Sequence, residues 1–244
     1  MKKLVVLTIL YAVQLAASAS PLSAVEAHVG ARIGGSIGSP VPFGNVPEGA
    51  SGSPIIGLVV GGFLDWKIDS VLSIVTELQF VHYGASFSTP LEDHPVIDRI
   101  PVQSPDGSTV IYEVETVFTG VANGRFSNDY LQAPIYLAWR PLQKWRFTGG
   151  IYIGWLVSTS SYATGTGQVG IRPETVEKDM YFNEQLKGLD YGFQLGTQFF
   201  AFDDLFLDMR AVVGLTSIFD EGYQTVDRTV QNAYVHVTLG YRLF

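Results

Sequence analysis

The sequence predicts an all-β protein, namely an eight-stranded antiparallel up-and-down transmembrane β-barrel with long extracellular loops. Apolar and polar residues alternate with a period of two over stretches of roughly ten residues, which is the pattern of strands with two different faces. The connections between these stretches are alternately short and long, as in outer-membrane barrels. Only 16% of the 244 residues are charged while 47% are hydrophobic, so much of the surface is not expected to face water.

The first residues form an export signal rather than part of the fold. Two lysines precede an apolar stretch, and the small residues at 17–19 have the pattern of a cleavage site. We therefore expect residues 1–19 to be a secretory signal peptide and residues 20–244 to be one outer-membrane β-barrel domain. The chain contains no Cys, which excludes disulfides and thiolate metal sites. Its net charge of −8 argues against a nucleic-acid partner.

Eight segments carry the strand alternation, and seven connections join them in chain order. The expected strands are 27–38, 54–66, 70–86, 129–140, 145–159, 187–202, 205–218 and 231–244. The short turns are 65–69, 141–144 and 203–204, and the long loops are 39–53, 87–128, 160–186 and 219–230. An even number of strands lets the last pair with the first, which leaves no exposed edge in the membrane.

The two faces are most distinct in three of these segments. In 145–159 Ile, Trp and Val alternate with Gly, Thr and Tyr, and in 231–244 Val and Leu alternate with Tyr, His and Thr. In 205–218 Leu, Met and Val alternate with a face that includes Asp208 and Arg210. Alternation alone does not say which face points inward, because a soluble barrel of the lipocalin type buries its apolar face.

Charged residues in phase with the polar face favour the membrane orientation. A lumen of eight strands is narrow enough to be filled by side chains. Opposite charges are expected to pair there, because an unpaired buried charge costs several kcal/mol. The predicted lumen charge network consists of Arg32, Glu77, Asp208, Arg210 and Arg242. We interpret it as structural; the alternative is a gate in which rearranged pairs open a narrow channel.

Aromatic residues and the charge distribution indicate the same orientation. Trp66, Trp139, Trp145 and Tyr241 lie close to a short turn or to the C-terminus, which suits rings at the level of lipid headgroups. The four long loops hold fourteen acidic and five basic residues, so the strands are nearly neutral, as a wall in contact with lipid is. The predicted location is the bacterial outer membrane, with its lipids as partners and both termini in the periplasm.

Four segments resemble the PorT-type outer-membrane β-barrel family, a relative in architecture of the small OmpA- and OmpX-like barrels. They are DYLQAPIYLAWRP (129–141), LKGLDYGFQLGTQF (186–199), RAVVGLTSIFD (210–220) and LGYRLF (239–244). The resemblance covers the mature chain and implies fold and location more than activity, although one member type is linked to protein secretion. Barrels of this kind often end in an in-phase aromatic residue read by the barrel-insertion machinery. Here Phe244 is terminal, but Tyr241 and Leu243 are in phase.

The second long loop contains a predicted hairpin. Asp106-Gly107 is a hairpin turn signal between two alternating segments of the loop 87–128. Val110, Tyr112 and Val114 share one side of the second segment. We predict that this hairpin projects beyond the membrane and binds an extracellular or envelope protein by strand addition. The alternative is an extension of the neighbouring strands without a partner.

The sequence motifs that could indicate catalysis or cofactor binding lie in segments whose expected structure does not suit those functions. Gly165–Gly170 matches G-x-G-x-x-G, but it lies in a long loop outside any βαβ unit, so we interpret it as a flexible glycine loop. No two histidines have metal-ligand spacing, and His236 is expected to be a hydrogen-bonded residue of the lumen. The expectation is therefore no catalytic residue, no metal and no cofactor.

These observations predict a structural or binding role through the extracellular loops, without catalysis. A component of outer-membrane secretion or transport, or a narrow channel, is the main alternative. A lipid-modifying outer-membrane enzyme and a soluble periplasmic ligand-binding barrel are the lesser alternatives.

Overall fold

The chain is described by a computed structural model that covers most of the expected mature protein. The described residues are 26–43, 48–104, 106–170, 174–181, 183–220 and 229–243. The predicted signal peptide and the terminal Phe244 lie outside them. Among these residues, no helix combines the length and apolarity needed to cross a membrane.

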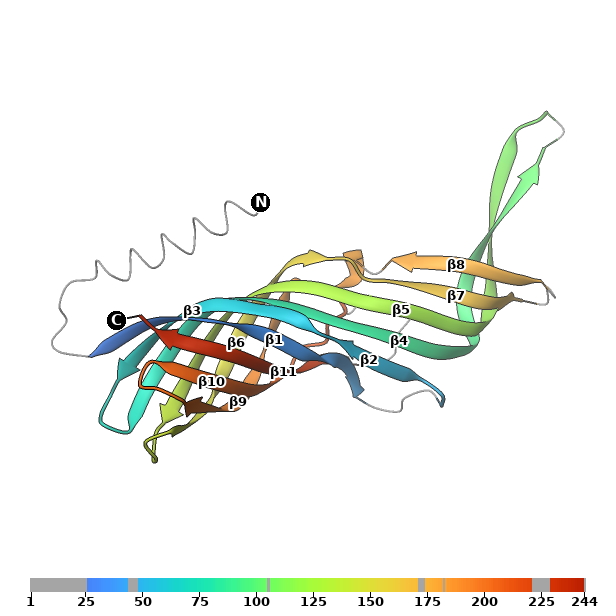
Figure 1. The fold of residues 1–244 in the computed structure, drawn as a ribbon. Helices are drawn as coiled ribbons and strands as arrows, with labels where there is room; N and C mark the ends of the chain where they lie inside the picture. The colour runs from blue at the N-terminus through green and yellow to red at the C-terminus, as the bar shows by residue number, and fades with distance from the viewer. Residues whose placement is uncertain are drawn as a thin grey trace.

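The described residues form eleven strands and one short 3-10 helix, in the order shown in Figure 1. Their bounds are β1 Ala27–Phe43, β2 Ser51–Ile55, β3 Gly57–Lys67, β4 Leu72–Gln103, β5 Thr109–Trp139, β6 Trp145–Thr159, β7 Tyr162–Val169, β8 Thr175–Tyr181, η1 Asn183–Gln185, β9 Leu189–Phe200, β10 Leu205–Gly214 and β11 Thr229–Arg242.

Eight of these strands close into a ring, which confirms the predicted eight-stranded antiparallel barrel. The ring runs β1, β3, β4, β5, β6, β9, β10 and β11, and β11 pairs back with β1. The closing register extends from Gly30 opposite Arg242 to Phe43 opposite Thr229. Closure satisfies the backbone groups of both terminal strands, which a lipid environment requires.

The apolar face of each ring strand points outward. On β10 the side chains of Leu207 and Met209 are 37% and 47% exposed, whereas Asp208 and Arg210 between and beside them are at most 1% exposed. Strands β9 and β11 show the same alternation of exposed and buried positions. The barrel therefore has an apolar outer wall and a polar, buried interior, which is the inverse of a soluble ligand-binding barrel.

Strands β4 and β5 continue far beyond the ring, so the predicted loop 87–128 is a β-structure. The two strands pair to their ends, where Gln103 lies opposite Thr109. Strand β2 pairs with the outer part of β4, β7 pairs with the outer part of β5, and β8 pairs with β7. Figure 1 shows this extension at the end of the barrel away from the short turns, with the β4–β5 hairpin turning away from it. Backbone pairing forms these strands although their faces are not sharply apolar and polar.

One glycine of the lumen makes room for an aromatic ring. A Cβ atom at Gly240 of β11 would lie 2.2 Å from Cζ of Phe206, which is itself buried against Phe63 and Phe200. The aromatic cluster at this end of the lumen therefore depends on the missing side chain. A Cβ at Gly62, in contrast, would meet only Gly30 O, at 3.6 Å.

The glycine motif at 165–170 forms strand rather than the expected flexible loop. Gly165 and Gly167 lie in β7, and Gly167 pairs with Gly120 of β5. The ring of Phe118 covers both partners, since a Cβ at Gly120 or Gly167 would lie within 3.0 Å of its Cζ atom. Gly170 follows the strand with a φ of 59°, a backbone conformation that favours glycine. The spaced glycines thus serve sheet packing.

We expect Gly240→Ala to destabilise the folded barrel by about 1–3 kcal/mol, because the added methyl group overpacks a filled aromatic cluster. Urea unfolding in detergent micelles, followed by tryptophan fluorescence, measures this loss. Gly62→Ala is the matched control and should be nearly neutral. Equal stability of the two variants would contradict the packing account.

Candidate functional site

Two arginines and two carboxylates form a network across the middle of the lumen. Arg210 of β10 lies 2.8 Å from Glu77 of β4 and 2.9 Å from Asp208 of its own strand. Arg32 of β1 lies 2.5 Å from the same Glu77 and 3.5 Å from Asp208. All four side chains are at most 2% exposed. Their charges cancel, so the network is neutral as a unit.

Polar neighbours complete the lumen charge network. The Tyr136 hydroxyl donates to Glu77, and its ring lies 4.3 Å from the Arg210 guanidinium. Gln198 donates to Asp208 over 2.7 Å. Buried charges are stable only when hydrogen bonds and opposite charges replace lost water. This arrangement connects β1, β4, β5, β9 and β10, and therefore strands on different sides of the ring.

Arg242 pairs with a different carboxylate and not with Glu77 or Asp208, contrary to the sequence prediction, and is linked to the network through Arg146, which donates to Gln198 over 3.5 Å. It lies 3.0 Å from Asp65 of β3, and Asp65 also accepts two hydrogen bonds of 2.7 and 2.8 Å from Arg146 of β6. The register places His236 opposite Arg210, so Arg242 is six residues, or about 20 Å of strand, nearer the short turns. The alternation of residues correctly predicted that the Arg242 side chain faces the lumen. It did not predict which carboxylate lies at the same level of the barrel.

The part of the lumen on the extension side of the charge network is held by side-chain hydrogen bonds and stacked rings. His236 lies 3.1 Å from the Tyr83 hydroxyl, and the Tyr83 and Tyr234 rings stack with centroids 3.8 Å apart. Higher up, Asp190 accepts hydrogen bonds from Tyr152, Thr216 and Asn232. His236 is 2% exposed, so its ring is enclosed rather than presented to a substrate.

Buried side chains fill the lumen at three heights. Separate clusters are centred on Phe206, on Tyr83 and on Phe219, from the short turns toward the extension. Charged groups that sequence reasoning did not select, namely Asp65, Arg146 and Asp190, also face inward. Each is in phase with the buried positions of its strand, so strict application of the period-two rule to β3, β6 and β9 would have found them.

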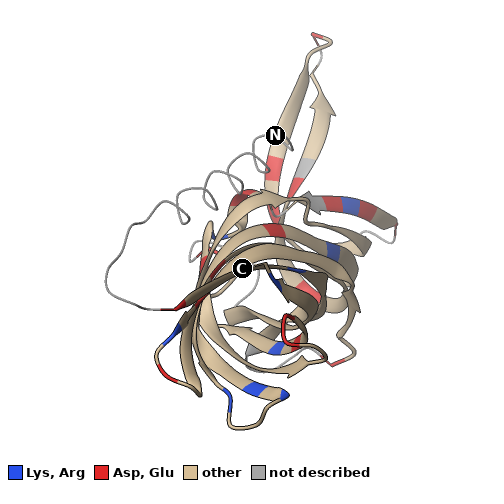
Figure 2. Cartoon of the chain, turned by 60° about the vertical axis from the view of Figure 1, so that its left-hand side comes forward, with Lys and Arg blue, Asp and Glu red and all other residues tan. Residues whose placement is uncertain are grey.

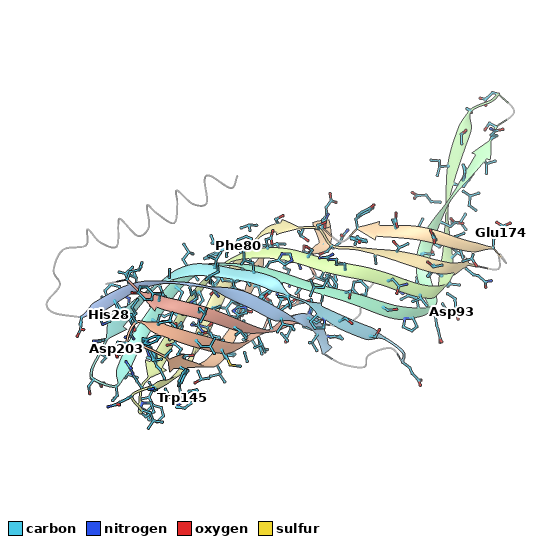
Figure 3. All side chains as sticks on the ribbon, in the orientation of Figure 1. His28, Phe80, Asp93, Trp145, Glu174 and Asp203 are labelled. Carbon is cyan, nitrogen blue, oxygen red and sulfur yellow. The ribbon has the colours of Figure 1, made fainter. Side chains whose placement is uncertain are left out.

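The selected interfacial aromatics lie on the outer wall at the short-turn end. Trp66, Trp139, Trp145 and Tyr241 are between 38% and 52% exposed. Trp145 contacts Phe199 across β6 and β9, with ring centroids 5.0 Å apart. Figure 3 shows Trp145 near Asp203 and His28 at this end. The structure places the four residues at one end of the barrel, and their role at lipid headgroups stays a prediction.

The selected hairpin residues are exposed along the end of β5. Val110, Tyr112 and Val114 are 41%, 55% and 43% exposed, and the first two lie opposite Val102 and Ile100 of β4. One face of the hairpin is therefore largely apolar. Among the described residues, the part of β5 from Thr109 to Val117 pairs with β4 and with no other strand.

A bulge and a tight turn shape this hairpin. The register of β4 and β5 shifts between Leu91 and His94, where Asp93 has a φ of 46° and exchanges hydrogen bonds with Thr119. At the tip, side-chain and backbone hydrogen bonds from Ser108 lower the pKa of the Asp106 carboxyl. The bulge redirects the two strands, which accounts for the change of direction in Figure 1.

The described residues contain no group of three or more His, Cys, Asp and Glu side chains arranged to hold a metal ion. The carboxylates of the lumen are instead engaged by arginine, tyrosine and amide donors. The chemistry that this arrangement supports is therefore charge pairing inside the barrel and backbone or apolar recognition along the hairpin.

Comparisons with known proteins give one family. The model of the family described as "Outer membrane protein beta-barrel domain" matches residues 17–220. The solved structures similar to this chain include Ail of Yersinia pestis, with 11% identity and a TM-score of 0.41, and Neisserial surface protein A, with 9% and 0.36. Outer membrane protein W of E. coli has 13% identity and a TM-score of 0.34. Each alignment covers 91% of this chain and all of the other. No curated protein sequence matches the chain.

We expect Glu77→Ala to destabilise the barrel by about 3–5 kcal/mol, because two buried guanidinium groups lose their shared carboxylate. Urea unfolding in micelles measures the loss, and Glu92→Ala in the extension is the exposed control. Planar-bilayer conductance of the folded variant should remain as low as that of the original chain, since the clusters above and below still fill the lumen. An open conducting state would support the gate instead.

Proposed function

The chain belongs to the family of outer membrane protein beta-barrel domains, and from this premise we propose that it is a sealed, non-catalytic barrel that acts by displaying its extension outside the cell. The observation that carries the proposal is the contrast between its two halves. One half has an apolar outer wall around a filled lumen, and the other is a paired β-structure beyond the ring. Membership of the PorT-type group remains part of the proposal.

The polarity of the outer wall supports a membrane position for the ring. On β5 the outward residues from Leu131 to Trp139 are apolar, and the next one toward the extension is Asp129, 2.7 Å from His82. The eight steps from Leu131 to Trp139 span about 26 Å of strand, or about 20 Å across the membrane at a tilt of roughly 40°. This height is close to the apolar band of such barrels. His82 and Asp129 then mark the outer headgroup level.

The distribution of charge supports periplasmic termini and an external extension. Figure 3 labels Asp93 and Glu174, two acidic residues of the long connections, at the extension end. The start of β1 and the end of β11 lie at the opposite end of the barrel, beside the short turns (Figure 1). Long external connections and short periplasmic turns are the usual arrangement of bacterial outer-membrane barrels.

The hairpin of β4 and β5 is the proposed binding element. Its outer part is a two-stranded ribbon with exposed apolar residues and one available edge on β5. An extended segment of an extracellular or envelope protein can add to such an edge through backbone hydrogen bonds. The filled lumen supports this role over passage of a solute through the barrel.

The orientation is tested by single cysteines, since the chain has none of its own. We expect Val114→Cys to react with a membrane-impermeant maleimide in intact cells. Leu142→Cys, which is 58% exposed in a short turn, should react only after the outer membrane is permeabilised. Heat-dependent migration on SDS gels verifies that both variants are folded. Labelling of Leu142→Cys in intact cells would contradict the proposed orientation.

The binding role is tested by removing residues 97–118. We expect the shortened barrel to remain heat-modifiable in the outer membrane, because the ring does not include the hairpin, but to lose its crosslinked protein partners in intact cells. A chain with Tyr112→Asp alone is the milder variant and should weaken the same crosslinks. An unchanged crosslinking pattern after the deletion would exclude the hairpin as the binding element.

A further inference from the structure

A cavity opens at the short-turn end of the barrel, apart from the extension. It has a volume of about 620 Å³ and lies between the turns that follow β3, β5 and β9. Its wall includes Ser70, Arg140, Lys144, Phe200 and Asp203. This volume falls in the range of small-ligand sites. Figure 3 labels Asp203 at this end of the molecule.

Two cations of the wall have no carboxylate partner among the described residues. The Arg140 guanidinium lies 4.4 Å from the centroid of the Phe200 ring, and its Nε and Nη2 atoms donate to the Gln143 carbonyl. These contacts hold the guanidinium in place. Lys144 follows in the same turn, and neither cation forms a salt bridge with Asp203 across the cavity.

The nearest buried carboxylate is already occupied. Asp65 pairs with Arg146 and Arg242, and the Arg242 guanidinium lies 4.9 Å from the same Phe200 ring as Arg140. The Nε atom of Arg242 is buried without a hydrogen-bond partner. Arg140 and Arg242 therefore lie against the same ring, Arg242 and Arg146 share one carboxylate, and the cavity wall itself holds two basic residues, Arg140 and Lys144, against one acidic residue, Asp203. Figure 2 turns this end of the ring toward the viewer, with basic and acidic segments around it.

We propose that the cavity binds a phosphate group. A guanidinium and a lysine ammonium are groups that proteins use for phosphate oxygens, and the contact of Arg140 with Gln143 engages its Nε and Nη2 atoms but not Nη1. The Ser70 hydroxyl is a third donor on the wall, and three donors suit the several oxygens of a phosphate better than the two of a carboxylate. The group belongs either to a phospholipid headgroup or to a soluble phosphate compound that reaches this end of the barrel. This assignment is independent of the binding hairpin.

The test is a titration of the folded full-length barrel in zwitterionic micelles with inorganic phosphate at constant ionic strength. Backbone amide NMR signals of 140, 142–144 and 200–203 report the binding. We expect saturable shifts and a Kd that rises at least about tenfold in the double variant Arg140→Gln, Lys144→Gln, because two charge-assisted contacts are lost. Lys67→Gln is the matched control, since that lysine is ion-paired with Glu26 at the same end of the barrel, and its Kd should be unchanged.

Two further measurements show whether the phosphate group belongs to a lipid or to a soluble compound, and whether a loss of binding reflects misfolding. Loss of inorganic phosphate binding in nanodiscs of phosphatidylglycerol or phosphatidylcholine, which both carry a headgroup phosphate, compared with micelles of an amine oxide, which carries none, indicates a lipid headgroup; retained phosphate binding in the nanodiscs indicates a soluble compound. If the double variant does not show heat-dependent migration, Lys144→Gln alone is used, and its Kd should still rise severalfold. Absence of saturable shifts, equal binding by a folded variant, or acetate binding as tight as phosphate binding would overturn the proposal.

Discussion

Closure of the sheet is the constraint on which the rest of the structure depends. Within a membrane each backbone donor and acceptor needs a partner inside the protein, and the register between β1 and β11 supplies these partners for the first and last strands of the ring. Closing only eight strands makes the interior narrow. The side chains that point inward must therefore satisfy one another, since there is no continuous water to do so.

The polar side chains of the interior are grouped at different levels along the barrel axis, and within each level they pair with one another. Arg32, Glu77, Asp208 and Arg210 cancel their charges at mid-height, and Asp65 engages two arginines nearer the short turns. Aromatic and aliphatic clusters separate these levels. A sealed lumen follows from this filling. Binding of other molecules is therefore expected at the two ends of the barrel, where strands or turns are exposed to water.

The two ends differ because only one of them continues as strands. Beyond the apolar wall, closure is no longer required by lipid, and β4 and β5 extend with β2, β7 and β8 at their sides. The extension is acidic and ends in a hairpin with exposed apolar residues. The short turns instead border an open cavity with two cations that have no carboxylate partner in the described part of the chain. The proposed binding element and the proposed phosphate site thus lie at opposite ends of one rigid wall.

The sequence by itself determined the number of ring strands and the faces of their residues. Strand β6 coincides with the expected 145–159, and four of the five selected lumen charges meet in one network. These features depend on local alternation, which a single strand carries. The assignment of Arg242 to Asp65, the strands within 160–186, and the pairing of β4 with β5 from the ring to the hairpin tip were decided only by the tertiary structure. They depend on closure, on register between distant strands and on backbone pairing, none of which a local pattern encodes.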